Sequence, residues 1–339
     1  MKKTVLFGTL TVAALVAGAA SATTLEDVKA RGELNCGSNA GLAGFAAPDA
    51  NGVYQGFDIA MCRAVAAAVL GDPMKVKVVP LSSETRFTAL SAGEVDMLAR
   101  TSTWTFSRDT DLKLDFVAVN YYDGQGFMVK KSLGVSSAKE LDGATVCIQT
   151  GTTTELNLAD YFKANGMKYQ PVPLKDNAEA AQQYSSGACD VYTTDSSGLA
   201  ATRATFANAA DHIILPEIIS KEPLALVVRH GDNQWGDIVR WTFNALLAAE
   251  EFGITSANVE EMAKAPGPNP EINRLLGTEG ELGAMMGLEK DWAVKAIKAG
   301  GNYGEIFEAN IGASTPIGLS RGLNALWTQG GLQYSPPFR

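Results

Sequence analysis

The chain is poor in residues that bind metals or perform acid–base chemistry. It has two histidines, His212 and His230, and four cysteines, none in a Cys-x-x-Cys pair. The histidines lie far from the cysteines in sequence, which argues against a zinc site. The sequence also lacks a Gly-x-Ser-x-Gly elbow, a P-loop and a Gly-x-Gly-x-x-Gly motif after a strand. We therefore predict no metal and no cofactor, although 37 acidic residues leave a paired-carboxylate hydrolase open.

Basic residues are outnumbered by acidic ones. Lysine and arginine together number 28 against 37 aspartates and glutamates, which gives a formal net charge of −9. Nucleic-acid binding proteins usually present a basic face. This balance excludes nucleic acid, and equally an anionic membrane surface, as a partner.

Long hydrophobic runs are absent except near the N-terminus. Lys2 and Lys3 precede an apolar run over residues 5–20, and Ala-Ser-Ala follows at residues 20–22. This pattern predicts a secretory signal peptide over residues 1–22, cleaved after Ala22, and hence export to the periplasm. No other run approaches the roughly 20 apolar residues that spanning a bilayer requires, so we expect a soluble mature protein without direct membrane insertion.

The remaining chain is longer than one hydrophobic core usually serves, so two domains are expected. Extended apolar runs alternate with helical patterns, which indicates an α/β fold with parallel strands. In the first half we expect strands at residues 32–37, 76–81 and 96–99 and helices at 25–30, 57–70 and 84–91. The second half repeats the pattern, with strands at 144–148 and 169–174 and helices at 154–165 and 178–185.

A short internal repeat relates the two halves. Ser-Ala-Gly-Glu-Val-Asp at residues 91–96 matches Ser-Ser-Gly-Ala-Cys-Asp at 185–190. Five residues after each final aspartate stand Thr101 and Asp195. If the halves share one layout, both residues lie at the carboxyl ends of corresponding strands, where open parallel sheets bind ligands. We expect two lobes that face each other across a cleft.

Two extended stretches, residues 122–130 and 223–229, are the expected crossings between the lobes. The first lobe then comprises residues 23–125, the second residues 126–226, and residues 227–339 return to the first lobe as a helical extension. Gly124 and Gly126 would let the backbone absorb a hinge rotation.

Hydroxyl side chains followed by one arginine mark the end of the predicted strand at 96–99. Residues 101–108 read Thr-Ser-Thr-Trp-Thr-Phe-Ser-Arg. Thr101 and Thr103 offer donors and acceptors, while the guanidinium of Arg108 fits a carboxylate bidentately. The alternative is a polar loop in which Arg108 pairs with Asp109 or Asp111.

Three further positions have both a ligand-binding and a purely structural interpretation. Thr152, with Thr153 behind it, has capping-box spacing to Glu155, so it either caps a helix or opens an anion site at that helix N-terminus. Asp195 either caps a helix over residues 199–208 or receives an ammonium group. Arg86 either reaches the cleft or is a solvated charge that pairs with Glu84 or Asp96.

Several motifs together resemble family 3 periplasmic solute-binding proteins, the amino-acid receptors of ABC transporters. They are Gly-Phe-Asp-Ile at residues 56–59, Thr-x-Thr-x-x-Arg at 103–108, Gly-Thr-Thr at 151–153, and Asp195. Tyr-Tyr-Asp-Gly-Gln-Gly-Phe-Met at 121–128 and Asp-Val-Tyr-Thr-Thr-Asp at 190–195 look like the general amino-acid branch, which includes receptors for glutamate, glutamine, aspartate and asparagine. The resemblance covers essentially the whole mature chain.

The resemblance implies a type II periplasmic-binding-protein fold, with two parallel-sheet lobes joined by a two-strand hinge and a free L-amino acid in the cleft. Arg108 would grip the ligand α-carboxylate, helped by backbone donors near Thr103 and Thr153. Asp195 and the Thr101 carbonyl would receive the α-ammonium. Arg86 would reach a distal carboxylate. Many members place an aromatic lid in residues 38–45; here Leu42 occupies that position, with Phe45 as the alternative.

The expected partners are a free amino acid and the membrane permease of an ABC transporter, and we expect a monomer without enzymatic activity. A second hypothesis is a periplasmic enzyme on the same scaffold, a prephenate- or arogenate-type dehydratase. Four cysteines allow three pairings. Because a bond between lobes would lock the hinge, we predict Cys36–Cys62 and Cys147–Cys189, each within one lobe.

Overall fold

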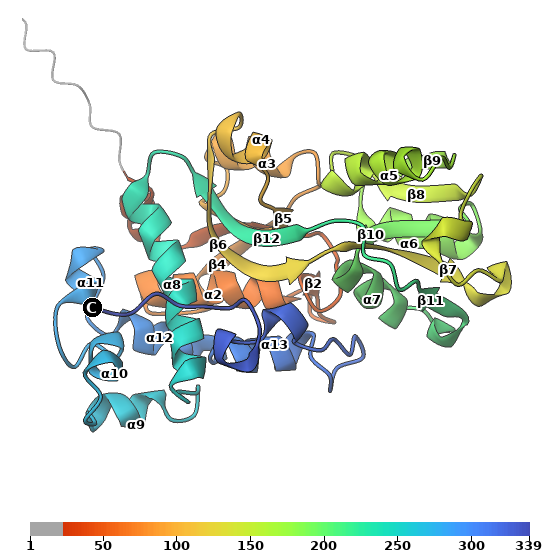
Figure 1. The fold of residues 1–339 in the computed structure, drawn as a ribbon. Coiled ribbons are helices and arrows are strands. Elements are labelled where there is room, and N and C mark those ends of the chain that lie inside the picture. Colours follow the sequence, from red (N-terminus) through yellow and green to blue (C-terminus); the bar gives the residue numbers. More distant parts are fainter. Residues whose placement is uncertain (1–22) are drawn as a thin grey trace, which may run out of the picture.

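The computed structural model describes residues 23–339, so the expected signal peptide of residues 1–22 lies outside the described residues. The chain forms two lobes, each built around a five-stranded sheet (Figure 1). A separate two-stranded ribbon pairs Ala47–Pro48 (β2) with Tyr54–Gln55 (β3).

The first sheet has the strand order β4-β1-β5-β12-β6. Its strands are Leu34–Ser38 (β1), Val76–Pro80 (β4), Met97–Thr103 (β5), Leu114–Asp123 (β6) and Glu222–Arg229 (β12). Strands β1, β4 and β5 are parallel, whereas β12 runs antiparallel to both β5 and β6.

The second sheet has the order β11-β7-β10-β8-β9. Its strands are Gln125–Lys130 (β7), Thr145–Gln149 (β8), Gln170–Leu174 (β9), Val191–Asp195 (β10) and His212–Ile214 (β11). Strands β8, β9 and β10 are parallel, and β7 runs antiparallel to β10 and β11.

Both sheets are therefore mixed, which corrects the prediction of parallel sheets. The stretches expected as crossings are mostly paired strands, because buried backbone N–H and C=O groups need partners and the sheet supplies them. Strand β12 begins at Glu222, so residues 222–226 belong to the first sheet and not to the second lobe as predicted.

Helices connect and cover the strands. Those of the first half are Thr24–Arg31 (α1), Phe57–Leu70 (α2), Arg86–Ser91 (α3) and Phe106–Thr110 (α4). The second lobe contains Thr153–Ala164 (α5), Asn177–Ser186 (α6) and Ser196–Ala204 (α7). The C-terminal part adds Asn233–Glu251 (α8), Val259–Lys264 (α9), Pro270–Leu275 (α10), Leu282–Met285 (α11), Trp292–Gly300 (α12) and Tyr303–Asn310 (α13).

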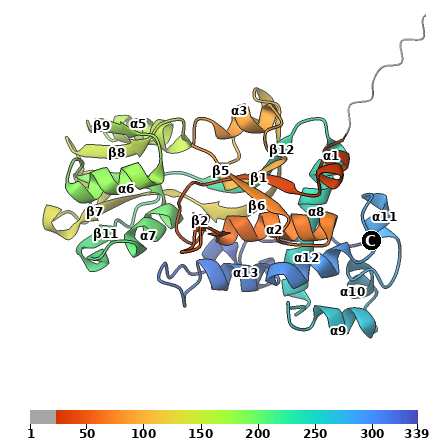
Figure 2. The ribbon, with the colours of Figure 1, turned by 180° about the vertical axis from the view of Figure 1, so that it is seen from behind.

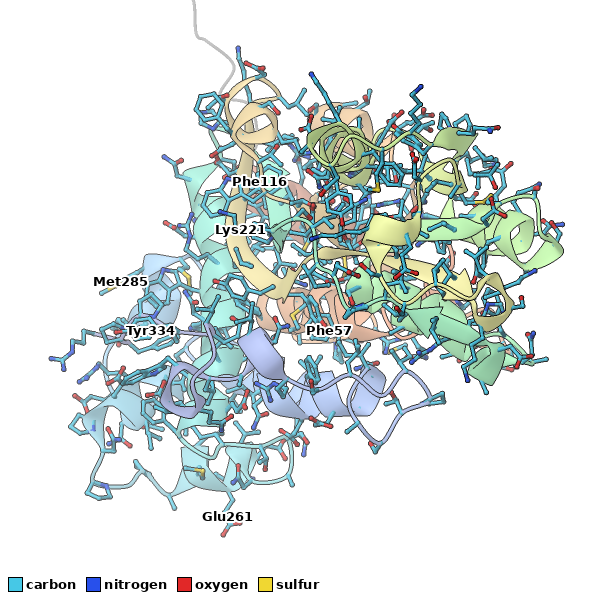
Figure 3. All side chains as sticks on the ribbon, turned by 45° about the vertical axis from the view of Figure 1, so that its right-hand side comes forward. Phe57, Phe116, Lys221, Glu261, Met285 and Tyr334 are labelled. Atoms are coloured by element: carbon cyan, nitrogen blue, oxygen red, sulfur yellow. A yellow bond between two sulfur atoms is a disulfide. The ribbon has the colours of Figure 1, made fainter. Side chains whose placement is uncertain are left out.

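The C-terminal helices pack on the first lobe. Trp235 and Ile238 of α8 and Trp292 of α12 share one apolar core with Phe57 and Val65 of α2. Both ribbon views place α12 and α13 beside α2 (Figures 1 and 2). Figure 3 shows Glu261 and Met285 on the side of this layer away from the second lobe. The extension thus thickens the first lobe and leaves the second lobe uncovered.

The chain crosses between the sheets twice, at residues 123–125 and 219–222. The two crossings are adjacent, since the Ile219 N–H donates to the Gln125 carbonyl at 2.9 Å. A Cβ on Gly124 would lie 2.3 Å from Ile218 Cγ2 and 2.8 Å from the Ser220 carbonyl oxygen. Glycine is required at 124 by this close approach, whereas a Cβ on Gly126 would meet its nearest neighbour at an ordinary 3.5 Å.

Both predicted disulfides are confirmed. Cys36 of β1 is bonded to Cys62 of α2, with the two Cα atoms 6.1 Å apart. Cys147 of β8 is bonded to Cys189, just before β10, with the Cα atoms 5.6 Å apart. Each bond joins elements of one lobe, so neither restrains the lobes relative to each other.

Candidate functional site

A polar pocket lies between the lobes, at the carboxyl ends of β5, β8 and β10 and the starts of α3, α5 and α7. It contains about 480 Å³ of space between atoms, including its opening to solvent. The predicted Arg86, Thr101, Thr103, Thr152, Thr153 and Asp195 all line it. The other lining residues are Asn39, Leu42, Ser83, Arg100, Gln149, Thr154, Asn177, Thr194, Ser197 and Gly198.

One wall of the pocket is the N-terminus of α5. Gly151 adopts a left-handed φ of 70°, and the Thr152 hydroxyl accepts the Glu155 N–H at 3.3 Å, so Thr152 is the helix cap. The Glu155 carboxylate accepts the Gly151 N–H at 3.3 Å, one residue before the position a capping box uses. The N–H groups of the first helical turn at Thr153 and Thr154 have no partner within the helix and carry its positive dipole end. The wall therefore suits a carboxylate.

The end of β5 forms the opposite wall. Thr101 has a φ of 39°, an uncommon conformation for a residue with a Cβ. The Asn39 side chain donates to the Thr101 hydroxyl at 3.1 Å and holds this turn in place. Asp58, buried beneath Thr101, accepts a hydrogen bond from Asn120 at 3.3 Å, and burial raises its pKa to about 7. Strain of this kind is concentrated at ligand sites.

Three arginines surround the pocket in different ways. The side chain of Arg100 is fixed, because its Nε donates to the Leu81 carbonyl at 3.1 Å and its Nη2 to the Ser83 hydroxyl at 3.2 Å. Arg86 is only 2% exposed, yet its Nε and Nη1 have no hydrogen-bond partner. Burial, together with the charges of Arg100 and Arg108, lowers the pKa of Arg86 well below its usual value. The wall of the pocket thus contains two donors without partners, beside the positive charges of Arg100 and Arg108 and the carboxylate of Asp195.

The structural alternative for Arg86, a solvated charge paired with Glu84 or Asp96, is wrong. Glu84 accepts a hydrogen bond from Thr150 across the lobes at 2.9 Å, and Asp96 forms an ion pair with Arg31. The predicted helix start at residue 84 moves to Arg86, which places this guanidinium at the carboxyl edge of the sheet.

Arg108 is not among the pocket-lining residues. Its Nη1 donates to the Thr103 carbonyl at 2.9 Å, and its Cζ lies 5.1 Å from the centre of the Phe87 ring. The alternative pairing with Asp109 or Asp111 is absent from the ion pairs of residues 23–339, and Asp109 instead accepts a hydrogen bond from Trp104 Nε1 at 3.0 Å. Arg108 therefore borders the pocket through Thr103.

Asp195 occupies the N-cap position of α7, which begins at Ser196 and not at the predicted residue 199. Its side chain makes no capping hydrogen bond. Burial and the nearby carboxylates of Asp123 and Glu222 raise the pKa of Asp195 well above its usual value, while Arg108 and Arg86 oppose that shift. An acceptor that is not used within the helix remains available to a cationic group.

Sequence reasoning missed Glu222, a carboxylate only 1% exposed. The hydroxyls of Thr103 and Thr153 donate to its Oε2 at 2.5 and 2.8 Å. These two hydroxyls are thus engaged by Glu222. The Trp104 N–H donates to the Pro223 carbonyl of β12. Because successive N–H groups of a strand point to opposite sides, the Thr103 N–H points away from β12. On that side β5 has no paired strand at Thr103.

Sequence reasoning also missed Arg100, Asn39 and Gln149. Asn39 follows β1 directly, and Gln149 ends β8, so the rule that selected Thr101 and Asp195 also applies to them.

The structure distinguishes between the two candidate lid residues, Leu42 and Phe45. Leu42 lines the pocket, whereas Phe45 is buried against Phe57 and Tyr121 in the core of the first lobe.

Within residues 23–339, no cluster of three or more His, Cys, Asp or Glu side chains is arranged to hold a metal ion. In the same residues no helix has the length and apolar character needed to cross a bilayer.

Comparison with known proteins identifies the family. The model for bacterial extracellular solute-binding proteins, family 3, matches residues 34–257. The chain is 75% identical over the full length of both proteins to the glutamate/glutamine/aspartate/asparagine-binding protein BztA of Rhodobacter capsulatus. It is 59% identical to the general L-amino acid-binding periplasmic protein AapJ of Rhizobium johnstonii, over 97% of this chain and 96% of that protein.

Among solved structures, a periplasmic binding protein of an ABC transporter from Brucella ovis, with glutathione bound, superposes with a TM-score of 0.91 and 59% identity. The match covers 94% of this chain and all of that one. The two-lobed architecture, the position of the pocket and these relatives agree, and the chain belongs to the bacterial extracellular solute-binding proteins of family 3.

Proposed function

We propose that the protein is the periplasmic binding component of an ABC transporter for L-amino acids and favours glutamate, glutamine, aspartate and asparagine. The observation that carries this proposal is Arg86, whose Nε and Nη1 are buried without partners in the wall of the pocket. Buried polar groups are nearly always hydrogen-bonded, so these donors call for a ligand oxygen. A side-chain carboxylate or amide oxygen supplies it.

The backbone of the amino acid is held by a clamp of opposite charges. The N–H groups at the start of α5 and the nearby guanidinium of Arg108 receive the α-carboxylate. Asp195 and the Thr101 carbonyl receive the α-ammonium. The ammonium of this ligand lies beside a buried carboxylate, and its carboxylate lies beside a cluster of arginines. These contacts compensate the cost of burying the charged side chains of the protein.

The names of the relatives support this choice of ligands. BztA is named for the two acidic amino acids and their amides, and AapJ for L-amino acids in general. The Brucella ovis protein holds glutathione. The γ-glutamyl end of glutathione is itself a free α-amino acid, so the same clamp fits it, with an amide oxygen towards Arg86.

The receptor works by closing two lobes around the crossings at 123–125 and 219–222. The first lobe comprises residues 23–123 with 222–339, and the second comprises residues 125–219. The receptor acts as a monomer after cleavage behind Ala22 and presents its closed form to a membrane permease. The relatives carry the names of binding proteins, which weighs against the dehydratase hypothesis.

The test is a calorimetric screen of the twenty amino acids and glutathione on refolded, ligand-free protein. We expect the tightest binding for glutamate, glutamine, aspartate and asparagine, with leucine and phenylalanine weaker. Failure of every amino acid to bind would overturn the proposal. Mass spectrometry of ligand carried through purification adds a second arm, since a receptor retains an intact amino acid whereas an enzyme converts it.

A further inference from the structure

Glu222 has no role in the clamp described above, yet its carboxylate accepts four side-chain hydrogen bonds. It is the first residue of β12, where the chain returns from the second lobe to the first. Two hydrogen bonds reach each of its oxygens. Thr103 and Thr153 donate to Oε2, while Asn157 Nδ2 and the Ser220 hydroxyl donate to Oε1, both at 2.7 Å.

The four donors belong to different parts of the molecule. Thr103 lies on β5 of the first lobe, whereas Thr153 and Asn157 lie on α5 of the second, and Ser220 lies in the crossing itself. One buried carboxylate therefore joins the two lobes directly. Because the acceptor is a carboxylate and the site excludes water, these hydrogen bonds are stronger than hydrogen bonds between two neutral groups.

The same two elements also form the ligand pocket, since Thr103 and Thr153 line it. A ligand held between β5 and the start of α5 keeps the donors of both lobes within reach of Glu222. If the lobes separate, Glu222 retains Thr103 and Ser220 on its own side and loses Thr153 and Asn157.

We propose that Glu222 is a positioning residue that holds the lobes closed over the ligand through Thr153 and Asn157 and so controls how long the ligand is retained. This inference rests on the proposed function, because it assumes an amino acid bound between the lobes. A positioning residue of this kind acts on dissociation more than on association, since the open form that captures the ligand lacks these bonds.

Two variants and one matched control test the proposal. Asn157→Ala removes one bond between the lobes and leaves the carboxylate three donors. Glu222→Gln replaces one acceptor oxygen with an amino group that opposes the incoming donors. Glu84→Gln is the control, because Glu84 also bonds across the lobes, to Thr150, but is exposed to solvent.

Stopped-flow fluorescence with L-glutamate as the probe gives the two rate constants. For Asn157→Ala and Glu222→Gln we expect the dissociation rate constant to rise at least tenfold, the association rate constant to change less than threefold, and Glu84→Gln to leave both within about twofold. Thermal unfolding of each variant shows whether it is folded. A dissociation rate constant unchanged in both variants would overturn the proposal, as would a loss confined to association.

A second measurement does not depend on the ligand. Spin labels at Glu94→Cys and Lys163→Cys, exposed residues of the first and second lobes, report the distance between the lobes in the ligand-free protein. We expect Asn157→Ala to lower the fraction of ligand-free molecules at the short, closed distance, and a closed fraction that is present in the wild type and equal in the variant would contradict the positioning role. Failure of the wild type to bind any amino acid, with this lower closed fraction still observed, would overturn the proposed function and leave the role of Glu222 in holding the lobes together supported.

Discussion

At the level of single residues, the pocket contains several groups that lower the stability of the folded protein when no ligand is bound. Arg86 has two buried donors without partners, Asp195 is a carboxylate with a raised pKa, and Thr101 has a positive φ. Each costs on the order of 1–3 kcal/mol if nothing compensates it. Their concentration in one pocket is explained most simply by a ligand that carries both an ammonium and a carboxylate.

Arg86 should discriminate between ligands by their distal groups. A guanidinium presents only donors, so it binds a carboxylate or an amide oxygen, and the charged bond is worth roughly 1.5–3 kcal/mol against about 1 for the neutral one. In calorimetric titrations we expect Arg86→Ala to weaken glutamate more than glutamine and to leave alanine nearly unaffected. Equal losses for all three ligands would show that Arg86 does not read the side chain.

Asp195 should matter equally to every amino acid, because all of them carry the α-ammonium. Asp195→Asn removes the charge but keeps the size, and we expect about tenfold weaker binding or more for each ligand, from the loss of a charged hydrogen bond of roughly 1.5–3 kcal/mol. Asp160→Asn, an exposed position on α5, is the matched control for the same titrations. Selective loss of some amino acids at full retention of others would contradict this role.

Asp58 should make the stability of the ligand-free protein depend on pH. Its pKa is about 7 when folded, against an ordinary value of 3.8, because it is buried. The folded pKa is the higher one, so the stabilising contribution is fully present below the unfolded pKa and is lost as the pH rises through about 7. Between pH 5 and pH 8 the loss amounts to about 2.5 kcal/mol.

Asp58→Asn, which mimics the protonated form, should remove this part of the pH dependence. The measurement is urea unfolding of the ligand-free wild type and variant at both pH values. The burial of Asp123 raises its pKa to about 6 and acts in the same direction, so some dependence will remain. An equal pH dependence of the unfolding free energy in both proteins would contradict the burial of an ionisable Asp58.

At the level of elements, strand ends were the most predictable feature. The repeat at residues 91–96 and 185–190 correctly indicated that Thr101 and Asp195 come together, because corresponding strands of two similar lobes end at facing edges. The antiparallel pairing of β12 was not predictable from the run at 223–229. Strand direction there depends on β5 and β6, which lie about a hundred residues earlier in the chain.

The same limit explains the missed residues. Glu222 receives its bonds from donors at positions 103, 153, 157 and 220, and no local pattern of the sequence contains that set. Arg100 lies in the middle of β5, where its buried charge is satisfied by the Leu81 carbonyl and Ser83 of a neighbouring loop. Local spacing can identify helix caps and strand ends, whereas contacts between distant segments require the fold.

The disulfide of the second lobe should stabilise that lobe without affecting ligand binding. Replacing Cys147 and Cys189 together by alanine should lower the free energy of unfolding by about 2–4 kcal/mol, mainly because the unfolded chain regains freedom. Chemical denaturation measures the loss. Calorimetry with glutamate should give an affinity within about twofold of the wild type, since neither cysteine lines the pocket. Unchanged stability would contradict a stabilising role for this bond.

At the level of the whole molecule, every feature of the site depends on two lobes that can approach each other. Both disulfides lie within lobes, the crossings are short and adjacent, and Gly124 permits their close packing. The pocket takes its wall residues from both lobes, so a separated pair of lobes would hold only half of the clamp. Binding and closure should therefore be one coupled event.

Small-angle X-ray scattering of ligand-free protein, titrated with L-glutamate, tests this coupling most directly. We expect a monomer whose radius of gyration falls and saturates at one glutamate per chain. Arg86→Ala, titrated at the same concentrations, serves as the control and should need more glutamate to reach the same endpoint. A radius of gyration that stays constant while calorimetry shows glutamate bound would contradict closure of the two lobes on an amino acid.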